Sequence, residues 1–503
     1  MIVAFLGSSG HMGVPTLLEF LKIPEIDKVK VLLQPKYKRN KLVKKIARKN
    51  PGKIEFYYGD VSNIEDVRKV LEDSSYCFNL AGVIPPLSDK HPELSYLANE
   101  VGPKNIVKVI EEHKEIKLID ITSVAVYCNR DEKHPFIRVG DPLIPSAYDL
   151  YATHKVRSEF AILESVVPYF VIIRQTAMIY RDMLTSNMND GIIFHTSFNS
   201  PLEWSTDEET AILLANIIRE DLAGNLTQDN FWRKVFNLGA KEENRISGYD
   251  TINNGFKLFG GEAKDFYDPN YNVIRNFHGG FYYDGDRIEK LLHYQKDYLD
   301  DYWLRIKKDH PELGFARIMP KKWIKSLSIK RLFKDENSPA YWYKHNDVAR
   351  ITAYFGSMEK YEKLPQKWDE FPIFDYKAIR SNSFYKPIDY GFDIDKEDRE
   401  ITITDLANVA KKHGGRLLSK EFKTGDVYAK LEWENSDGEK FIARPYTILR
   451  AGHWYNPIYK EYVWDFDRLS KKDELYATFW YDTHDKDEDH CYYMNEKYEA
   501  KLR

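Results

Sequence analysis

The chain has 503 residues, of which 43% are hydrophobic and 30% are charged, a composition typical of a soluble globular protein. Its 74 Lys and Arg residues nearly balance its 78 Asp and Glu residues, and the net charge of −4 excludes a general electrostatic attraction to nucleic acid or to an anionic membrane. We therefore expect neither as a partner, although this balance does not exclude a local basic patch.

The cysteine content and the N-terminus bear on the compartment. Cys77, Cys128 and Cys491 are too few and too widely spaced for a disulfide framework, which favours a reducing compartment. The first residues already read as a strand and leave no room for a signal peptide. No apolar run approaches the ~18 residues that span a bilayer. We predict a cytoplasmic protein.

The first 240 residues alternate between two patterns. Short runs of Val, Ile, Leu and Phe predict buried strands at 1–6, 29–34, 54–58, 76–80, 116–121 and 169–174. Segments with apolar residues at i, i+3 and i+4 predict helices near 12–22, 39–48, 63–72, 97–112 and 149–166. A further strand is expected at 235–238. This alternation predicts an α/β fold with a Rossmann-type, doubly wound parallel sheet.

We predict three regions. Residues 1–315 form one domain, with a dinucleotide-binding core (about 1–180 and 235–250) and a small substrate-binding subdomain (about 181–234 and 251–315). Within it, the stretch from Asp286 to about Leu304 is helical by pattern. Residues 316–395 are an aromatic-rich connecting region without a clean period. Residues 396–503 form a C-terminal α+β region that begins with a helical pattern at 401–413.

A glycine turn follows the first strand at G-x-x-G-x-x-G spacing, and a helix follows the turn at once. Such glycines let the backbone approach a pyrophosphate, and the helix N-terminus offers free N–H groups and a positive dipole end. The turn therefore predicts a dinucleotide site. Its expected cofactor-binding residues are Gly7, Ser9, Gly10, His11, Met12 and Gly13.

The end of the second strand bears on the choice of cofactor. Gln34 stands where many dinucleotide folds carry an acid for the ribose hydroxyls, and Lys36, Lys38 and Arg39 follow. These cations would suit a ribose 2′-phosphate, or they simply lie on the first turns of a surface helix. The sequence slightly favours NADP over NAD and leaves both open.

A Tyr–Lys pair marks the fifth helical segment. Tyr151 and Lys155 are four residues apart, so a helix places them on one face. A neighbouring ammonium stabilises a phenolate, which suits tyrosine for proton exchange with an alcohol or a carbonyl. Ser123 ends the preceding strand where a hydroxyl could bind the reacting oxygen, with Thr122 as the nearest alternative.

With these motifs in this order, the chain resembles the extended short-chain dehydrogenase/reductases, also called the NAD-dependent epimerase/dehydratase family, over about residues 1–310. Further matching motifs are Gly59-Asp60-Val61, Asn79-Leu80-Ala81-Gly82, Ser123-Val124-Ala125-Val126-Tyr127 and Arg174. The resemblance implies that Asp60 contacts adenine and that Asn99 takes part in a water relay. The remaining cofactor-binding residues expected are Val61, Leu80, Ala81, Gly82, Ile121, Tyr151, Lys155 and Gln175.

The chain also departs from this family. Val124 and Ala125 stand where 4,6-dehydratases carry an Asp–Glu pair, which argues against dehydration. Cys128 replaces a glycine, and the usual Asn before Tyr-Gly-Pro is missing, which weakens the case for a nucleotide diphosphate substrate. We favour a neutral or apolar alcohol or ketone, such as a steroid, terpenoid or aryl carbonyl compound.

Residues 405–460 resemble a small treble-clef zinc finger in which every cysteine is replaced, so no metal is expected there. His484 and His490 flank four acids and could form a metal site, but a solvated loop is the favoured interpretation. We predict no metal in the protein.

These features together favour an NAD(P)-dependent enzyme that interconverts an alcohol and a carbonyl on a small substrate. Tyr151 would be the acid and base, Lys155 would lower its pKa, Ser123 would hold the oxygen, and Asn99 would serve the relay. We expect a homodimer. Two alternatives stay open: a nucleotide-sugar epimerase with tightly held NAD, and a non-catalytic dinucleotide-sensing or scaffold protein.

Overall fold

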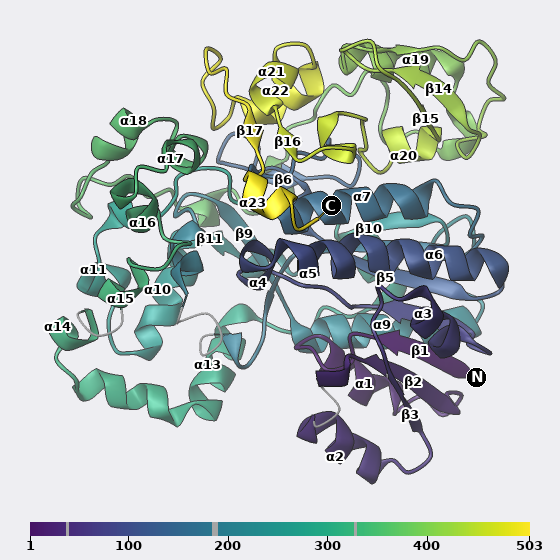
Figure 1. Ribbon diagram of the computed structural model, residues 1–503, viewed down its shortest axis with the longest axis horizontal. Helices are drawn as coiled ribbons and strands as arrows, with labels where there is room; N and C mark the ends of the chain where they lie inside the picture. Colours follow the sequence, from purple (N-terminus) through teal and green to yellow (C-terminus); the bar gives the residue numbers. More distant parts are fainter. Residues whose placement is uncertain (37–39, 184–189, 326–328, 503) are drawn as a thin grey trace.

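The computed structural model describes residues 1–36, 40–183, 190–325 and 329–502 (Figure 1). Lys38 and Arg39, which were expected to bind a 2′-phosphate, lie outside these ranges. Within the described ranges, no helix is both long enough and apolar enough to cross a membrane.

A seven-stranded parallel sheet lies at the centre of the N-terminal part. Its strand order is β10-β7-β5-β4-β1-β2-β3. The strands are β1 (Ile2–Leu6), β2 (Lys28–Leu33), β3 (Ile54–Tyr58), β4 (Tyr76–Asn79), β5 (Lys117–Ser123), β7 (Phe170–Gln175) and β10 (Lys234–Leu238). The order reverses between β1 and β4, and ligands bind at such a switch point in doubly wound folds. The predicted Rossmann-type sheet is confirmed.

Helices cover both faces of the sheet. Helices α3 (Ile64–Leu71), α6 (Gly102–Glu112) and α7 (Leu150–Leu163) contribute to one core cluster. Helices α1 (Gly13–Phe20), α2 (Lys41–Lys49), α9 (Asp207–Leu222) and α12 (Asp286–Leu292) contribute to the other. The Val, Ile and Leu runs of the strands are buried because both faces are covered in this way.

Smaller elements extend from the carboxyl edge of the sheet. Three short strands, β8 (Ala177–Ile179), β9 (Pro201–Thr206) and β11 (Arg245–Ser247), form one sheet, and β6 (Phe136–Ile137) pairs with β12 (Phe281–Tyr282). Helix α10 (Gly248–Leu258) contacts β11 and is followed by α11 (Ala263–Phe266), whereas α4 (Leu87–Lys90) and α5 (Pro92–Tyr96) contact α7.

The structure corrects one of the predicted helices. The pattern from Asp286 to Leu304 is two helices, α12 and α13 (Leu299–Asp309). His293 adopts a left-handed conformation with φ of 46° and ends α12. Apolar spacing continues through such a break, so periodicity alone does not reveal it.

The connecting region is helical, with α14 (Lys321–Ile324), α15 (Lys330–Leu332), α16 (Pro339–Lys344), α17 (Val348–Phe355) and α18 (Met358–Glu362). The C-terminal region starts with α19 (Ile403–Lys412), inside the predicted range. Its other elements are β13 (Arg416–Leu417), β14 (Leu431–Glu434), β15 (Lys440–Ala443), α20 (Pro445–Leu449), β16 (Val463–Trp464), α21 (Phe466–Ser470), α22 (Glu474–Trp480), β17 (Tyr492–Tyr493) and α23 (Glu496–Glu499).

The C-terminal region packs on the side of α7 that faces away from the sheet, as the yellow-green segments above α7 in Figure 1 show. The Trp464 indole donates to the Thr153 hydroxyl at 3.2 Å, and the Arg157 guanidinium donates to the Ile458 carbonyl at 2.6 Å. Eleven of the fourteen residues of α7 are buried as a result. The helix that carries Tyr151 and Lys155 is therefore enclosed on two sides.

Candidate active site

The glycine turn between β1 and α1 is a tight cradle. Gly7 has a φ of 93°, and a Cβ atom there would lie 2.6 Å from the backbone of Leu80. A Cβ on Gly13 would lie 2.1 Å from the Gly7 carbonyl oxygen. The N-cap residue Met12 makes no side-chain capping bond, and the Val14 and Thr16 amides of α1 donate to the Gly10 and Met12 carbonyls at 3.0 and 3.3 Å. Only glycine fits the two crowded positions.

Three polar side chains belong to this turn. The His11 ring stacks on Tyr180 with centroids 4.0 Å apart, and burial lowers the pKa of His11. Ser9 is half-buried beside it. The buried hydroxyl of Ser8 finds no hydrogen-bond partner in the described part of the chain. A close backbone cradle with an unsatisfied buried hydroxyl fits a dinucleotide pyrophosphate.

The ends of β2 and β3 meet at the same edge of the sheet. Gln34 donates to Asp60 Oδ2 at 2.6 Å, and Ser62 donates to Asp60 Oδ1 through its backbone and its hydroxyl. Burial would raise the pKa of Asp60, but the bonds from Ser62 and Gln34 and the charge of Lys36 hold it below its ordinary value. Asp60 is therefore an anionic acceptor, as the predicted adenine contact requires.

The loop after β4 is held from behind by Asn99. Its amide donates to the Val83 carbonyl at 2.8 Å and accepts from the Val83 amide at 3.1 Å. It also donates to the Ser95 hydroxyl at 3.1 Å. These bonds fix the loop that contains Leu80, Ala81 and Gly82. The predicted water relay through Asn99 stays a prediction, because the bonds seen here are structural.

Ser123 and Tyr151 lie together at the carboxyl end of β5. The Ser123 hydroxyl accepts from the Ala125 amide at 3.2 Å and lies beside the Tyr151 phenol, where it lowers the pKa of that phenol. Burial raises the pKa of Tyr151 well above its ordinary value, and the bond with Ser123 offsets only part of this. In the protein alone the phenol is protonated at neutral pH, which is the form that donates a proton.

Lys155 lies one helical turn beyond Tyr151. Its ammonium donates to the Ile121 carbonyl at 2.9 Å and is buried. Burial lowers the pKa of Lys155, while the carboxylates of Asp120 and Glu159 raise it in part. The sequence-based expectation was that Lys155 lowers the pKa of Tyr151. In the structure the environment of Tyr151 is dominated by burial, so that role stays a proposal.

Asp120 is a residue that the sequence analysis missed. It is fully buried on β5, one position before Ile121, and it accepts from the Asn79 amide at 2.6 Å. Its second oxygen has no hydrogen-bond partner in the described residues. Burial raises the pKa of Asp120 to about 6, and Lys155 opposes this shift. An acid within a run of buried apolar residues was the available sequence signal.

Gln175, at the end of β7, was also expected to bind the cofactor. Its amide donates to the Ser205 hydroxyl at 2.6 Å and accepts from the Thr210 hydroxyl at 3.0 Å. Both partners come from β9 and α9. Gln175 therefore connects the main sheet to the smaller one, and its contact with a cofactor stays a prediction.

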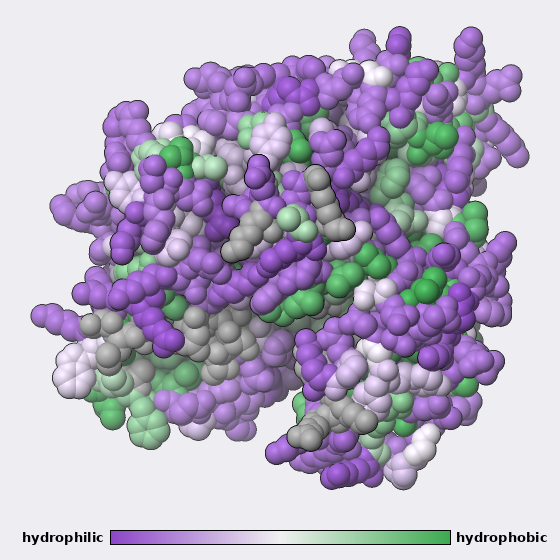
Figure 2. All heavy atoms as spheres, viewed as in Figure 1, coloured by the Kyte–Doolittle hydropathy of each residue, from purple (hydrophilic) through white to green (hydrophobic). Residues whose placement is uncertain are grey.

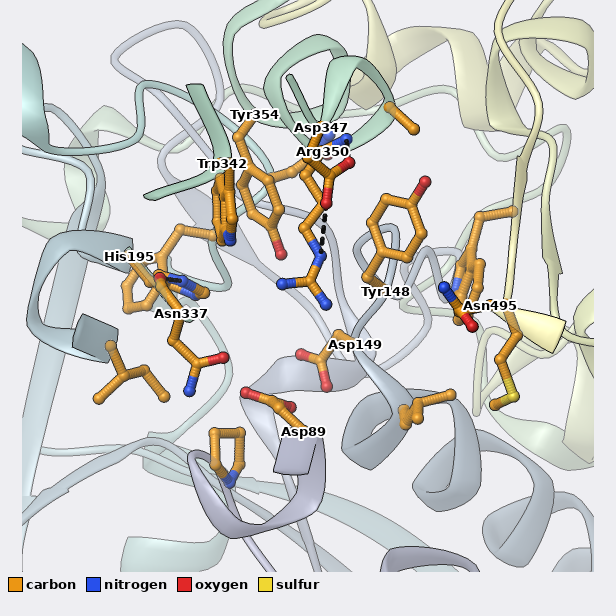
Figure 3. Close-up of a pocket in the computed structure, with 18 of the residues that line it drawn as sticks. Asp89, Tyr148, Asp149, His195, Asn337, Trp342, Asp347, Arg350, Tyr354 and Asn495 are labelled. Atoms are coloured by element: carbon orange, nitrogen blue, oxygen red, sulfur yellow. Dashed lines mark hydrogen bonds and ion pairs between the residues drawn. The ribbon is translucent and has the colours of Figure 1, made fainter. Parts of the chain in front are cut away.

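A cavity of about 300 Å³ opens at the start of α7. Tyr148, Asp149 and Leu150 line it, and Tyr151 is the next residue in the chain, although Tyr151 itself is not among the lining residues. Tyr148 adopts a left-handed conformation with φ of 67°, and its ring points into the cavity (Figure 3). A non-glycine residue in this conformation is strained, which is a feature of ligand sites.

The cavity walls come from every region of the chain. Figure 3 shows Asp89 and Asp149 from the Rossmann part opposite Trp342 and Arg350 from the connecting region. Asn495 adds an amide from the C-terminal region. The cavity volume lies at the lower end of the range for small-molecule sites. None of the lining residues beyond 316 was expected in this site, because no sequence pattern places them near Tyr151.

Charge is concentrated in the centre of this cavity. The Arg350 guanidinium points toward Asp149 and lies 5.5 Å from the centre of the Trp342 ring (Figure 3). Burial, and then the neighbouring Asp149, raise the pKa of Asp89 to about 7. Burial lowers the pKa of His195 to about 4, and this ring bonds the Asn337 carbonyl at 2.6 Å. The cavity thus offers hydrogen-bonding groups of both kinds between aromatic rings.

One other cluster in the described residues has metal-ligand chemistry. Asp467, Glu488 and His490 bring their ligand atoms within 4.8 Å of one another. Glu488 already forms two bonds with the Arg275 guanidinium, at 2.8 and 2.7 Å, and Asp467 accepts from the Trp480 indole at 2.7 Å. The Arg275 guanidinium neutralises Glu488, and the indole bond satisfies one oxygen of Asp467, so both carboxylates already have partners within the protein.

Comparisons with known proteins match the N-terminal part of the chain. Residues 4–168 match the 3-beta hydroxysteroid dehydrogenase/isomerase family. The UDP-glucose 4-epimerase of Rickettsia bellii (strain OSU 85-389) is 30% identical over 126 residues, and that of Rickettsia rickettsii is 29% identical over 126 residues. Each alignment covers 24% of this chain and 36% of the epimerase, so the chain matches about a third of the length of these relatives. The resemblance of the N-terminal part to the epimerase/dehydratase family is confirmed.

Two solved structures align with part of the chain. The dTDP-glucose 4,6-dehydratase DesIV of Streptomyces venezuelae, a double mutant with NAD and DAU bound, has a TM-score of 0.49 at 16% identity and covers 62% of this chain and 97% of its own. The UDP-glucuronic acid 4-epimerase of Bacillus cereus, in complex with UDP-glucuronic acid and NAD, has a TM-score of 0.47 at 18% identity and covers 62% of this chain and all of its own.

Proposed function

We propose that this chain is an NAD(P)-dependent oxidoreductase that interconverts an alcohol and a carbonyl group on a small substrate. The observation that carries the proposal is the contact between the Ser123 hydroxyl and the Tyr151 phenol at the carboxyl edge of the sheet, with Lys155 one turn further on. The glycine cradle lies at the same edge, at the end of β1. A hydride donor bound in the glycine cradle and the Tyr151 proton donor could meet at this edge.

Each residue of the group has its own role in the proposed reaction. When bound, the nicotinamide supplies or accepts the hydride. Ser123 holds the reacting oxygen by a hydrogen bond, and Tyr151 gives a proton to it during reduction or takes one during oxidation. Because burial raises the pKa of Tyr151, the resting enzyme is ready to donate. Lys155 contributes its positive charge, which stabilises the phenolate that is left behind.

The cavity at the start of α7 would hold the part of the substrate that does not react. Arg350 and Asn337 could donate hydrogen bonds to a substrate there, Asp89 and Asp149 could accept them, and Trp342 offers a flat apolar face. These groups suit a substrate with hydroxyl groups better than a purely apolar steroid or terpenoid, which could not hydrogen bond with them. We therefore propose a small, neutral, hydroxyl-bearing substrate and no longer favour an apolar one.

The test is the Tyr151→Phe variant. It removes one oxygen, so the folded protein should bind NADH or NADPH as the wild type does, measured by nucleotide fluorescence. Hydride transfer over a panel of carbonyl compounds, followed by nicotinamide absorbance, should fall by about 100-fold or more. Tyr343→Phe, at an exposed tyrosine, is the matched control and should keep full activity. Undiminished turnover by Tyr151→Phe would refute the proposal.

A second candidate is a nucleotide-sugar epimerase, which the match to UDP-glucose 4-epimerases supports. In that case the hydride returns to the same molecule, and NAD would stay bound. Mass spectrometry of the released cofactor distinguishes the two: NAD retained through purification, with no net nicotinamide turnover, supports the epimerase. A cofactor-bound chain that is inactive toward both substrate classes would instead support a non-catalytic sensing or scaffold role.

A further inference from the structure

The segment from α13 to α14 exposes apolar side chains to an unusual degree. Of the six most exposed large hydrophobic residues in the described chain, four lie between positions 304 and 323. They are Leu304 (62%), Phe315 (70%), Ile318 (82%) and Trp323 (62%). Single exposed apolar residues need no explanation, but four within twenty residues form a patch that marks an interaction surface.

These side chains gather at one corner of the molecule. In Figure 2 the green spheres at the lower left cover the corner where Figure 1 places α13 and α14. Phe315, Ile318 and Trp323 follow one another at intervals of three and five residues, and Met319 beside them is also exposed. We call this set of apolar residues, Leu304 to Trp323, the 304–323 patch.

The surroundings of the patch are strongly basic. Residues 304–334 contain ten Lys or Arg and only two acids, Asp309 and Glu312, within a chain whose net charge is −4. Lys307, Lys308 and Lys322 are exposed next to the apolar side chains. Three of the basic residues of the segment, Arg305, Lys321 and Lys325, are paired with acids outside it. Lys330, Arg331 and Lys334 are exposed to solvent.

We propose that the 304–323 patch docks the protein on an anionic lipid bilayer surface. Exposed aromatic and aliphatic side chains bordered by lysines are the combination that inserts at the headgroup boundary while the ammonium groups contact anionic lipid. A second copy of the chain is a poorer occupant, because two such basic surfaces would repel each other. The balanced net charge led us to expect no membrane partner, but that argument concerns the whole surface and not this corner.

Docking would bring the bilayer close to the candidate active site. Asp309, at the end of α13, forms an ion pair with Arg181, and the neighbouring Tyr180 stacks on His11 of the glycine turn. The patch is thus connected to the cofactor turn through two contacts. The docking proposal itself does not depend on the proposed reaction.

The experiment is co-sedimentation of the full-length protein with vesicles. Vesicles of phosphatidylcholine with about one third phosphatidylserine should bind the protein at low salt, and pure phosphatidylcholine vesicles should bind it at least about ten-fold more weakly. Raising the salt to 1 M, where the Debye length is about 3 Å, should weaken the binding to the anionic vesicles.

Two variants locate the contact. Combined Phe315→Ser, Ile318→Ser and Trp323→Ser should reduce vesicle binding by about ten-fold or more, since insertion depends on apolar area. The matched control is Ile442→Ser, at a residue that is 62% exposed on β15, far along the chain from the patch. It should bind as the wild type does. Both variants change exposed side chains, and unaltered nucleotide binding confirms that they fold.

Several results would overturn the proposal. The first is no binding to anionic vesicles at low salt, and the second is equal binding by the triple variant. A third is a concentration-dependent oligomer that the triple variant dissolves, since the occupant would then be a second copy. A fourth is patch-dependent retention on single-stranded RNA or DNA without vesicle binding, which would assign the surface to nucleic acid.

Discussion

Removing the charge of Glu159 should destabilise the protein strongly. Glu159 and Arg174 are both fully buried, and the guanidinium donates to the carboxylate at 2.6 to 3.2 Å. The other guanidinium protons go to Tyr127 at 2.5 Å, to Val139 at 2.9 Å and to Ala451 at 2.8 Å. All five N–H groups of Arg174 are therefore used, and among the described residues its one carboxylate partner is Glu159.

The size of the expected loss in unfolding free energy follows from these contacts. Despite burial, Arg174 and His453 hold the pKa of Glu159 down at about 2, so the carboxylate is charged at neutral pH. Glu159→Gln keeps the shape but leaves a buried guanidinium without a counter-charge, and breaking a buried pair in this way costs about 3–5 kcal/mol. That is a large share of the stability of an ordinary domain.

The assay is urea unfolding of both proteins, followed by tryptophan fluorescence. Glu159→Gln should lower the unfolding midpoint with little change in slope. The matched control is Glu359→Gln, which breaks an exposed pair with Lys363 and should leave the midpoint unchanged. If Glu159→Gln lowers the free energy of unfolding by less than about 1 kcal/mol, the reasoning is refuted, because water must then reach the guanidinium.

Three further predictions concern the site. Asp120→Asn removes a carboxylate that raises the pKa of Lys155, so the activity should decline at a lower pH on the alkaline side of the pH–activity profile. If the alkaline decline does not move, Lys155 is not the group that titrates in it. His195 has a pKa of about 4 when folded against 6.5 as its ordinary value, so the unfolded chain binds more protons in that window, and the free energy of unfolding should fall as the pH drops from 6.5 to 4. His195→Gln should make this dependence shallower, and an unchanged slope would contradict it. Gly13→Ala places a Cβ 2.1 Å from a carbonyl oxygen and should abolish nucleotide binding, whereas Gly314→Ala meets no atom within 4 Å and should bind normally.

The parts of the fold that rest on local pattern could be predicted from the sequence. The seven strands of the main sheet lie within one or two residues of their expected bounds, because a strand covered on both faces must be apolar throughout. The Ser123, Tyr151 and Lys155 group is similarly local: two of the three sit four residues apart on one helix, and the third ends a strand. The structure brings these residues to one edge.

The cavity could not be predicted in this way. Tyr148, Trp342 and Asn495 lie more than 150 residues apart in the chain, and only tertiary packing brings them to one wall. Residues 316–395 show no period because their helices are short and are buried by aromatic contacts on several sides. Arg350 therefore looked like any surface arginine, although it lies at the centre of the cavity (Figure 3).

The spacing on α7 connects the candidate reaction centre to the C-terminal region. Tyr151, Lys155 and Glu159 recur every four residues, so they form one stripe along the helix. Tyr151 meets Ser123, Lys155 faces Asp120, and Glu159 meets Arg174 and the His453 ring of the C-terminal region, which lies 3.3 Å from its carboxylate. A shift of the C-terminal region would therefore move the stripe that holds Tyr151, the proposed proton donor. Through this contact the C-terminal region would take part in the proposed chemistry, since it both lines the cavity and packs on the helix that carries Tyr151.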